Sequence, residues 1–213
     1  MDMQLELHKD FPDELRTEWN ELATQGVTQV PFLHYEYMKT WWQTRGGGEW
    51  SDAELAIVTA RKNGRLVGIA PLFYAIHQEK PALMLLGSIE VFDYLDLIVR
   101  QEDLTAFAGA LLDFIDGLDW PQWQVLNLYN ILDHSPSLKA LEDAALERRW
   151  SFQMEKHLPS PYISLPGDWE TYLAGIKKKQ RHEIRRKIRR LEEGEIHSRW
   201  YIMDDPDKLD AEM

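Results

Sequence analysis

Cysteine is absent from this chain of 213 residues. Its absence excludes disulfide bridges, thiolate metal sites and a cysteine nucleophile. A chain without disulfides fits a reducing compartment. Cysteine chemistry therefore plays no part in this stretch of 213 residues.

Long apolar runs are also absent. Charged and apolar side chains alternate over residues 1–10, so this segment does not form the apolar core of a secretory signal. No run approaches the roughly 20 apolar residues that a membrane-spanning helix needs. We therefore expect a soluble protein of the cytoplasm without a membrane span.

Several catalytic signatures are missing as well. There is no P-loop and no Gly-x-Ser-x-Gly motif, so kinase and hydrolase functions have no support. His182 and Glu183 are followed by Arg186 where a His-Glu-x-x-His zinc motif needs its second histidine. The seven histidines show no other ligand spacing, and we predict no metal.

The composition that is present is typical of a folded α/β protein. Hydrophobic residues make up 44% of the chain and aromatic residues 11%, against 28% charged residues, which lies far from disordered compositions. The length suits one large domain, or one domain and the start of a second.

Positive charge is concentrated in one segment. The net charge of the chain is −12, yet residues 177–190 contain nine Lys or Arg and one Glu. An acidic body with a basic stripe can hold an anion at the stripe and repel polyanions elsewhere.

Apolar periodicity predicts alternating strands and helices up to residue 165. A strand at 3–8 is followed by helices beginning near Phe11 and Pro31. The Asn63-Gly64 pair predicts a hairpin between strands at 55–60 and 66–74. The remaining predictions are strands at 83–87, 94–99 and 125–129, an amphipathic helix at 104–115, a helix from Ser135-Pro136 and an extended stretch at 152–165.

Prolines at 159, 161 and 166 mark a joint, after which Asp168 caps a predicted long basic helix at 169–193. A further helix opens at residues 204–206, and only a few residues of it remain before Met213. So short a helix has nothing against which to bury its apolar face. We therefore expect the chain to be truncated.

Five stretches, in this order, resemble the branch of the GNAT N-acetyltransferase superfamily that includes FemAB-like ligases and cellulose-biosynthesis-type acetyltransferases. They are PFLHYEYMKTWW, GRLVGIAPLFY, LLGSIEVFDYLDLIV, SPYISLPGDWETYLAGI and KKKQRHEIRRKIRRLEEG. The resemblance implies an α/β (α+β) fold with a mixed, largely antiparallel sheet flanked by helices. It places a first GNAT-like lobe at 1–157 and the opening elements of a second lobe at 158–213.

This resemblance implies transfer of an acyl group from acetyl-CoA or another acyl-CoA. The acceptor would be an amine or hydroxyl of a small molecule, sugar, peptide or cell-wall or polysaccharide precursor. Three alternatives stay open: a FemAB-like ligase that uses aminoacyl-tRNA, an RNA-binding module acting through residues 177–190, and an inactive acceptor-binding or scaffold lobe. The acidic remainder of the chain argues against a wide RNA footprint.

GNAT enzymes bind the CoA pyrophosphate through backbone amides of a [Gln/Arg]-x-x-Gly-x-[Gly/Ala] loop between a strand and a helix. Residues 43–48 match this pattern but follow a predicted helix, where the glycines more readily act as a helix stop. At the expected junction, residues 100–103 contain no glycine and two acids, which repel phosphate. We therefore expect the acyl-CoA site mainly in the missing part of the second lobe.

Candidate site residues fall in three groups. Asp93, Tyr94 and Asp96 lie at the entry of an apolar strand, where a carboxylate either faces a cleft or is bonded internally. Asp96 is the candidate catalytic residue, as a base or an orienting group for the acceptor. Trp41 and Trp42 either form an aromatic wall for the acceptor, or one of them packs in the core and the other covers it as a lid.

The third group consists of Lys177, Arg181 and Arg185 on the basic helix. A separate apolar stripe on the same helix predicts an ordinary packed helix with a basic outer face. That face is either a clamp for phosphate or carboxylate or a solvated surface.

Overall fold

The computed structural model of the chain describes residues 3–44, 50, 52–87, 91–120, 122–157, 159, 161–194, 201–203 and 205–208. The chain divides into two compact units, Met1–Leu158 and Pro159–Met213, beside the prolines that predicted a joint. That the second unit opens another GNAT-like lobe stays a prediction. Each unit is treated separately below.

The first unit is a mixed α+β fold with largely antiparallel sheets and flanking helices, which confirms the predicted class. Its strands are β1 (Gln4–His8), β2 (Glu54–Leu55), β3 (Ile57–Lys62), β4 (Arg65–Ala70), β5 (Leu72–His77), β6 (Lys80–Leu85), β7 (Ile98–Val99) and β8 (Val125–Asn127). Its helices are α1 (Arg16–Ala23), α2 (Tyr35–Thr44), α3 (Leu104–Asp116) and α4 (Pro136–Glu147), with the 3-10 turns η1 (Asp13–Leu15) and η2 (Pro31–Leu33).

The strands form two four-stranded sheets, ordered β1-β3-β4-β7 and β2-β5-β6-β8. All neighbouring strands are antiparallel except β6 and β8, which are parallel. The strand predicted at 66–74 is in fact two strands, one in each sheet, which meet at Pro71. Proline has no N–H to donate to a ladder, so the hydrogen-bonded run ends there and the chain passes to the second sheet.

Two of the antiparallel strand pairs in these sheets are hairpins, each closed by a tight turn. Asn63 and Gly64, with φ of 54° and 79°, form the turn between β3 and β4, as the sequence predicted. Gln78 and Glu79 also take positive φ, 49° and 65°, in the turn between β5 and β6. Neither residue favours that conformation, so the second turn carries no sequence signal.

The predicted strand at 94–99 is reduced to the two residues of β7. Immediately before β7, the Asp96 carboxylate accepts a hydrogen bond of 2.7 Å from the backbone N–H of Leu97. A local side-chain bond of this kind takes the N–H away from the sheet ladder. The strand therefore begins only after Asp96.

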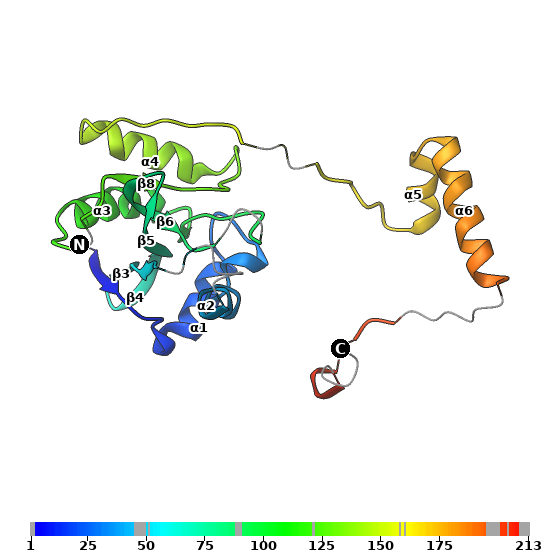
Figure 1. The fold of residues 1–213 in the computed structure, drawn as a ribbon, viewed down its shortest axis with the longest axis horizontal. Helices are drawn as coiled ribbons and strands as arrows, with labels where there is room; N and C mark the ends of the chain where they lie inside the picture. Colours follow the sequence, from blue (N-terminus) through cyan, green and yellow to red (C-terminus); the bar gives the residue numbers. More distant parts are fainter. Residues whose placement is uncertain are drawn as a thin grey trace. The chain divides into compact units, whose positions relative to one another are not determined.

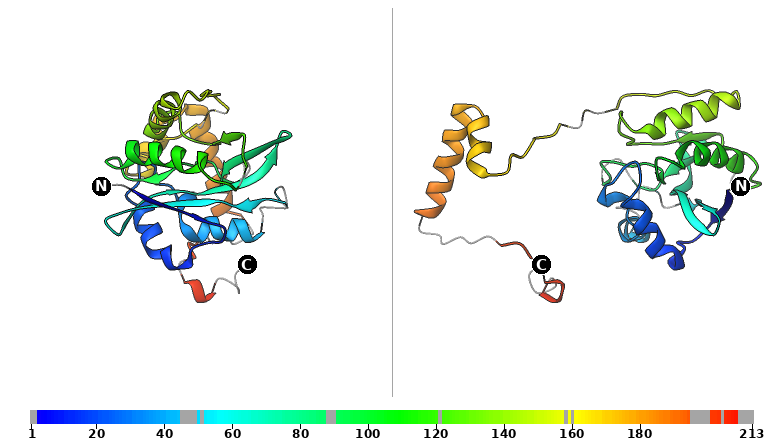
Figure 2. Two further views of the ribbon diagram at one scale, coloured as in Figure 1. Left: turned by 90° about the vertical axis from the view of Figure 1, so that its left-hand side faces the viewer. Right: turned by 180° about the vertical axis from the view of Figure 1, so that it is seen from behind.

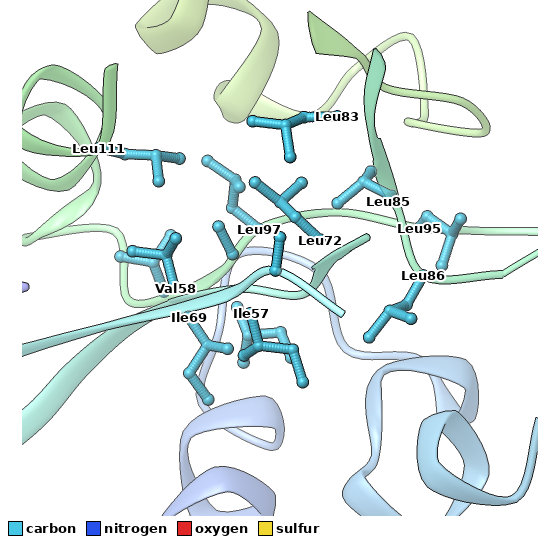
Figure 3. Close-up of a cluster of buried hydrophobic side chains, with 14 of the residues drawn as sticks. Ile57, Val58, Ile69, Leu72, Leu83, Leu85, Leu86, Leu95, Leu97 and Leu111 are labelled. Atoms are coloured by element: carbon cyan, nitrogen blue, oxygen red, sulfur yellow. The ribbon is translucent and has the colours of Figure 1, made fainter. Parts of the chain in front are cut away.

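Helices cover both faces of the strands (Figures 1 and 2). α1 and α2 lie on one side and α3 and α4 on the other, and both α1 and α3 contact β4. Figure 3 shows aliphatic side chains from both sheets, from α3 and from the segment before β7 gathered in one cluster. The labelled members are Ile57, Val58, Ile69, Leu72, Leu83, Leu85, Leu86, Leu95, Leu97 and Leu111.

The helix patterns on the α3 side are confirmed. The apolar positions of α3 are buried as predicted, and the Ser135 side chain caps α4 by accepting from the N–H of Ser137 at 3.2 Å. Within the described ranges, no helix is both long enough and apolar enough to cross a membrane.

In the second unit the predicted single helix at 169–193 is wrong. Two helices are present, α5 (Trp169–Gly175) and α6 (Lys178–Glu192), followed by the turn η4 (Pro206–Lys208). Ile176 and Lys177 between them have ψ of 162° and 138°, outside the helical region. Gly175 has low helix propensity and the β-branched Ile176 favours extended backbone, so the chain leaves the helix at this point. Asp168 caps α5 through the N–H of Thr171.

Candidate functional site

A surface hollow of about 530 Å³ lies where α1 ends and α2 begins. Its lining combines a carboxylate, an imidazole, a phenol, an amide and a hydroxyl with apolar groups. The lining residues are Ala23, Thr24, Gln29, Val30, Pro31, His34, Glu36 and Tyr37. Polar groups that converge on one concavity can fix the orientation of a small molecule.

Hydrogen bonds between the two helices hold the wall of this hollow in place. The buried Trp19 on α1 donates its indole N–H to the carbonyl of Leu33 at 2.9 Å. The Asn20 side chain accepts from the backbone N–H of Tyr35 at 2.9 Å, at the first turn of α2. The start of α2 is therefore fixed against α1, and the side chains that follow it are held at the hollow.

Glu36 is held in its ionised form. The Asn20 amide donates to it at 2.8 Å and the Arg16 guanidinium at 2.5 Å. The Asn20 bond first, then a hydrogen bond from the backbone N–H of Glu36, and then the Arg16 guanidinium lower the pKa of Glu36 to about 2. The hollow therefore presents a carboxylate at neutral pH, and the neighbouring Arg16 offsets part of its charge.

His34 supplies the imidazole of the hollow and is half-buried. Among the described residues, none forms a hydrogen bond with this ring. A neutral imidazole offers one donor and one acceptor nitrogen. His34 is therefore available to a ligand as a hydrogen-bonding group or as a base.

Aromatic rings border the hollow and connect it to the segment that carries two predicted site residues. Phe32 lies with its ring centroid 5.3 Å from that of Tyr37 and 6.3 Å from that of Tyr94. The Tyr37 hydroxyl donates to the carbonyl of Val91 at 3.5 Å. The half-buried Tyr94 is thus linked through Phe32 to the hollow, and the neighbouring Asp93 is exposed in the same segment.

Asp96, the candidate catalytic residue, is fully buried. Besides the N–H of Leu97, the hydroxyls of Thr28 and Ser135 each donate to its carboxylate at 2.5 Å. These partners belong to the segment after α1 and to the N-cap of α4, so Asp96 ties three parts of the first unit together. That Asp96 acts on an acceptor stays a prediction, and this geometry favours the alternative of an internally bonded carboxylate.

The two adjacent tryptophans differ in burial. Trp41 is 4% exposed and packs in the core, with its ring centroid 5.7 Å from that of Phe92. Its indole N–H has no hydrogen-bond partner among the described residues. Trp42 is half-buried beside Phe73. Of the predicted aromatic wall, Trp41 is buried and Trp42 is partly exposed.

The predicted basic clamp belongs to the second unit. Arg181 donates to the carbonyls of Leu173 and Ala174, at 3.1 and 3.2 Å, and so satisfies backbone groups at the end of α5. Arg185 pairs with Glu170 of α5 at 2.5 Å. Lys177 is exposed just before α6. Two of the three predicted clamp residues thus have partners within their own unit, and their role in binding an anion stays a prediction.

The junction between β7 and α3 does not fit an acyl-CoA pyrophosphate. The N–H of Asp103, next to the start of α3, already donates to the carbonyl of Arg100 at 3.1 Å. The Asp103 carboxylate lies 3.3 Å from Lys62, and the adjacent Glu102 is exposed. Two acids at this helix start disfavour a bound phosphate, although Lys62 offsets part of the Asp103 charge. That the donor binds elsewhere stays a prediction. Of the alternative loop at 43–48, residues 45–48 lie outside the described part of the chain.

The hollow can bind a ligand that carries a positive charge or several hydroxyls. Glu36 attracts an ammonium group, while Gln29 and Thr24 supply hydrogen-bonding groups.

Sequence reasoning missed His34, Glu36 and Tyr37, although all three lie in the stretch PFLHYEYMKTWW that contributed to the resemblance. In the parts of the chain that the structure describes, no group of three His, Asp or Glu side chains could hold a metal ion.

No protein-family model matches the sequence, and no curated protein matches it either. Several solved structures have a similar arrangement of elements. A ribosomal-protein-alanine N-acetyltransferase from Brucella melitensis biovar Abortus is 17% identical, with a TM-score of 0.43, over 76% of this chain and 100% of that one. A possible acetyltransferase from Clostridium difficile is 11% identical, with a TM-score of 0.43, over 78% of this chain and 100% of the other.

An aminoglycoside 6'-N-acetyltransferase from Acinetobacter haemolyticus is also 11% identical, with a TM-score of 0.40, over 76% of this chain and 99% of the enzyme. Identities and TM-scores this low describe a loose likeness of fold. The mixed α+β class of the chain rests on its own helices and sheets.

Proposed function

We propose that this chain is part of an acyltransferase and that the hollow between α1 and α2 binds the acceptor. The acceptor is a small molecule, sugar or cell-wall precursor that presents an amine or a hydroxyl. The order of elements in the first unit supports this function. A strand, two helices, a set of antiparallel strands and a strand-helix pair follow one another as the GNAT resemblance implies.

The observation that carries this function is the presence of His34 and Glu36 in one hollow. An ammonium group is attracted by the ionised Glu36 carboxylate, and His34 accepts a proton from it. The neutral amine that results has a free electron pair and is a nucleophile. A hydroxyl acceptor can donate its proton to His34 in the same way. The residues of the hollow therefore orient the acceptor and remove its proton.

No donor step is assigned to the first unit. The acids at the β7–α3 junction do not fit the pyrophosphate of acetyl-CoA or another acyl-CoA. On this proposal the first unit contributes acceptor binding, and the acyl donor binds elsewhere in the enzyme. This agrees with the expectation that the donor site belongs mainly to a second lobe.

Glucosamine, which carries a primary amine on a sugar, tests the acceptor site. We expect the full chain to bind it, and His34→Ala to weaken binding roughly three- to tenfold through loss of a hydrogen bond. Glu36→Gln removes a partly exposed charge and should weaken binding roughly two- to fivefold. NMR titration, followed at the backbone amide signals, measures both effects.

Two controls accompany this titration. His134→Ala removes an exposed histidine far along the chain and should leave the affinity unchanged. N-acetylglucosamine, whose nitrogen is neutral, should bind less tightly than glucosamine. Equal affinities for wild type and both hollow variants would show that the acceptor does not bind in this hollow.

Acetyl-CoA itself should bind weakly or not at all to this chain, because the first unit has no amide cradle at the β7–α3 junction. Isothermal titration calorimetry measures this directly. Micromolar affinity that is lost on replacing Gly46, Gly47 and Gly48 would contradict the expectation and would assign the donor to residues 43–48.

A further inference from the structure

Apolar side chains form an exposed strip on α6 that the acceptor hollow does not use. The strip consists of Ile184, Ile188 and Leu191, which are separated by four and three residues and so lie on one side of the helix. Ile184 is half-buried, whereas Ile188 is 38% exposed and Leu191 is 57% exposed. The strip is therefore most exposed near the end of α6.

The helix α5 covers only the first part of α6. Arg185 pairs with Glu170 near the start of α5 at 2.5 Å, and Arg181 donates to the carbonyls of Leu173 and Ala174 near its end. The two helices are therefore antiparallel, and Figure 1 shows α6 extending past the start of α5. The exposed end of the strip belongs to this extension.

An aromatic pair lies at the same end of the two helices. Trp169 is the first residue of α5 and is 51% exposed, and its ring is stacked on that of Tyr172 with the centroids 5.4 Å apart. The adjacent Glu170 binds Arg185, so Trp169 lies at the level where the strip becomes exposed. Tryptophan is enriched at the boundary between membrane and water, because its ring is apolar and its N–H is polar.

Cations lie on both sides of the strip. At helical spacing Lys187 is the neighbour of Leu191 on one side, and Arg185 is the neighbour of Ile188 on the other. In total, α6 contains eight Lys or Arg and two Glu. No described carboxylate forms an ion pair with Lys187 or Arg190, and both side chains are exposed. An apolar strip with a basic border is typical of helices that lie in an anionic membrane surface.

A basic recess on another side of α6 contains no apolar residue. It is lined by Lys178, Lys179, His182, Glu183, Arg186 and Arg189. A helix that lies in a bilayer surface keeps such a side in water, where its cations attract anionic headgroups over a longer range. Both sides of α6 therefore suit the same partner.

Other partners match only one of these features. A polyanion such as RNA would pair with the cations and leave Ile188 and Leu191 in water. A second copy of α6 would bury both residues, but it would bring two strongly basic helices together. An acidic protein that wraps a basic helix needs access to most of its surface, and α5 already occupies part of α6.

We propose that α6, together with Trp169, binds the surface of an anionic lipid bilayer. Ile188 and Leu191 enter the boundary between headgroups and acyl chains, and Lys187 and Arg190 bind lipid phosphates. The helix lies along the surface and does not cross the bilayer. This site involves residues of the second unit alone and does not depend on the acceptor hollow.

Flotation of the full chain with vesicles tests the proposal. We expect binding to phosphatidylcholine vesicles that contain about 30% phosphatidylglycerol, and much weaker binding to phosphatidylcholine alone. Replacing Ile188 and Leu191 together with glutamine should lower the partition coefficient roughly tenfold, because two apolar side chains no longer enter the lipid. Glutamine is a good helix former, so α6 should persist, which circular dichroism can check.

The basic border and the aromatic ring have their own variants. Lys187→Gln combined with Arg190→Gln should lower the partition coefficient roughly twentyfold, taking roughly fivefold for each cation. The loss should shrink at high salt, which screens the surface charge. Trp169→Ala should weaken binding roughly threefold.

A matched control removes two exposed apolar side chains from the first unit. Leu146→Gln combined with Met154→Gln should leave vesicle binding unchanged. Absence of binding to the anionic vesicles would overturn the proposal, as would equal weakening by this control pair or equal binding to phosphatidylcholine alone. So would either of two results without vesicle binding: an RNA duplex that binds, or a dimer that dissociates when Ile188 and Leu191 are replaced.

Discussion

Asp96→Ala is expected to destabilise the first unit by about 2–4 kcal/mol, measured by urea denaturation of the full chain. The substitution removes the acceptor for the hydroxyls of Thr28 and Ser135, which are themselves buried, and leaves a small cavity. It also frees the N–H of Leu97. The effect is large because three segments of the chain meet at this single carboxylate.

Two further variants separate this structural role from a catalytic one. Asp96→Asn keeps an oxygen that can accept from both hydroxyls, so it should be less harmful than alanine. Asp93→Ala changes an exposed carboxylate and should alter stability by about 0.5 kcal/mol or less. On the proposed function, an Asp96→Asn variant that kept its stability and lost acyl-transfer activity would assign Asp96 a role on the substrate.

Gly68→Ala should destabilise the first unit by about 1–3 kcal/mol, again by urea denaturation. A Cβ added to Gly68 on β4 would lie 2.6 Å from the ring of Phe107 on α3. Phe107 is fully buried, so its ring has no free space into which to move. The glycine therefore sets how closely α3 approaches the sheet.

A double-mutant cycle checks this cause. Phe107→Leu alone should destabilise by about 1 kcal/mol, and combined with Gly68→Ala it should relieve part of the clash, so the two effects do not add. Gly109 lies on α3, the helix of Phe107. A Cβ added there would have only the Arg148 side chain nearby, at 3.8 Å, so Gly109→Ala should stabilise the first unit by up to about 1 kcal/mol. Additive effects in the cycle would rule out the contact as the cause.

The parts of the fold that the sequence predicts well are those that local chemistry determines. Asn63-Gly64 forms a hairpin turn because both residues tolerate positive φ. The α3 helix appears where apolar residues recur at helical spacing, and Ser135 caps α4 because its hydroxyl reaches a free N–H. Each of these signals lies within a few residues of the element that it specifies.

Other features depend on partners that are distant in sequence. The division of residues 66–74 between two sheets follows from Pro71 together with the pairing of β5 with β2 and β6. The shortening of β7 follows from the hydrogen bonds of Asp96. The break at Ile176 separates two helices that Arg181 then joins, and periodicity alone could not reveal such a break.

The candidate site also depends on contacts between residues that are distant in sequence, which the sequence alone does not reveal. Tyr94 was found because its segment contains unexpected polar residues, and it lies beside the ring of Phe32. Glu36 was missed because the contacts that hold its carboxylate at the hollow come from Asn20 and Arg16 on the preceding helix. His34 was one of seven histidines without ligand spacing, and only the hollow distinguishes it from the others.

Pro71 also bears on the behaviour of the unfolded chain. Residues 66–76 contain no charged side chain and are rich in β-branched and aromatic residues. Such a segment, if uninterrupted, can stack with copies of itself into cross-β aggregates while the protein folds. Pro71, at which the chain leaves one sheet for the other, also divides this segment into two five-residue pieces. It therefore reduces the tendency of the segment to aggregate.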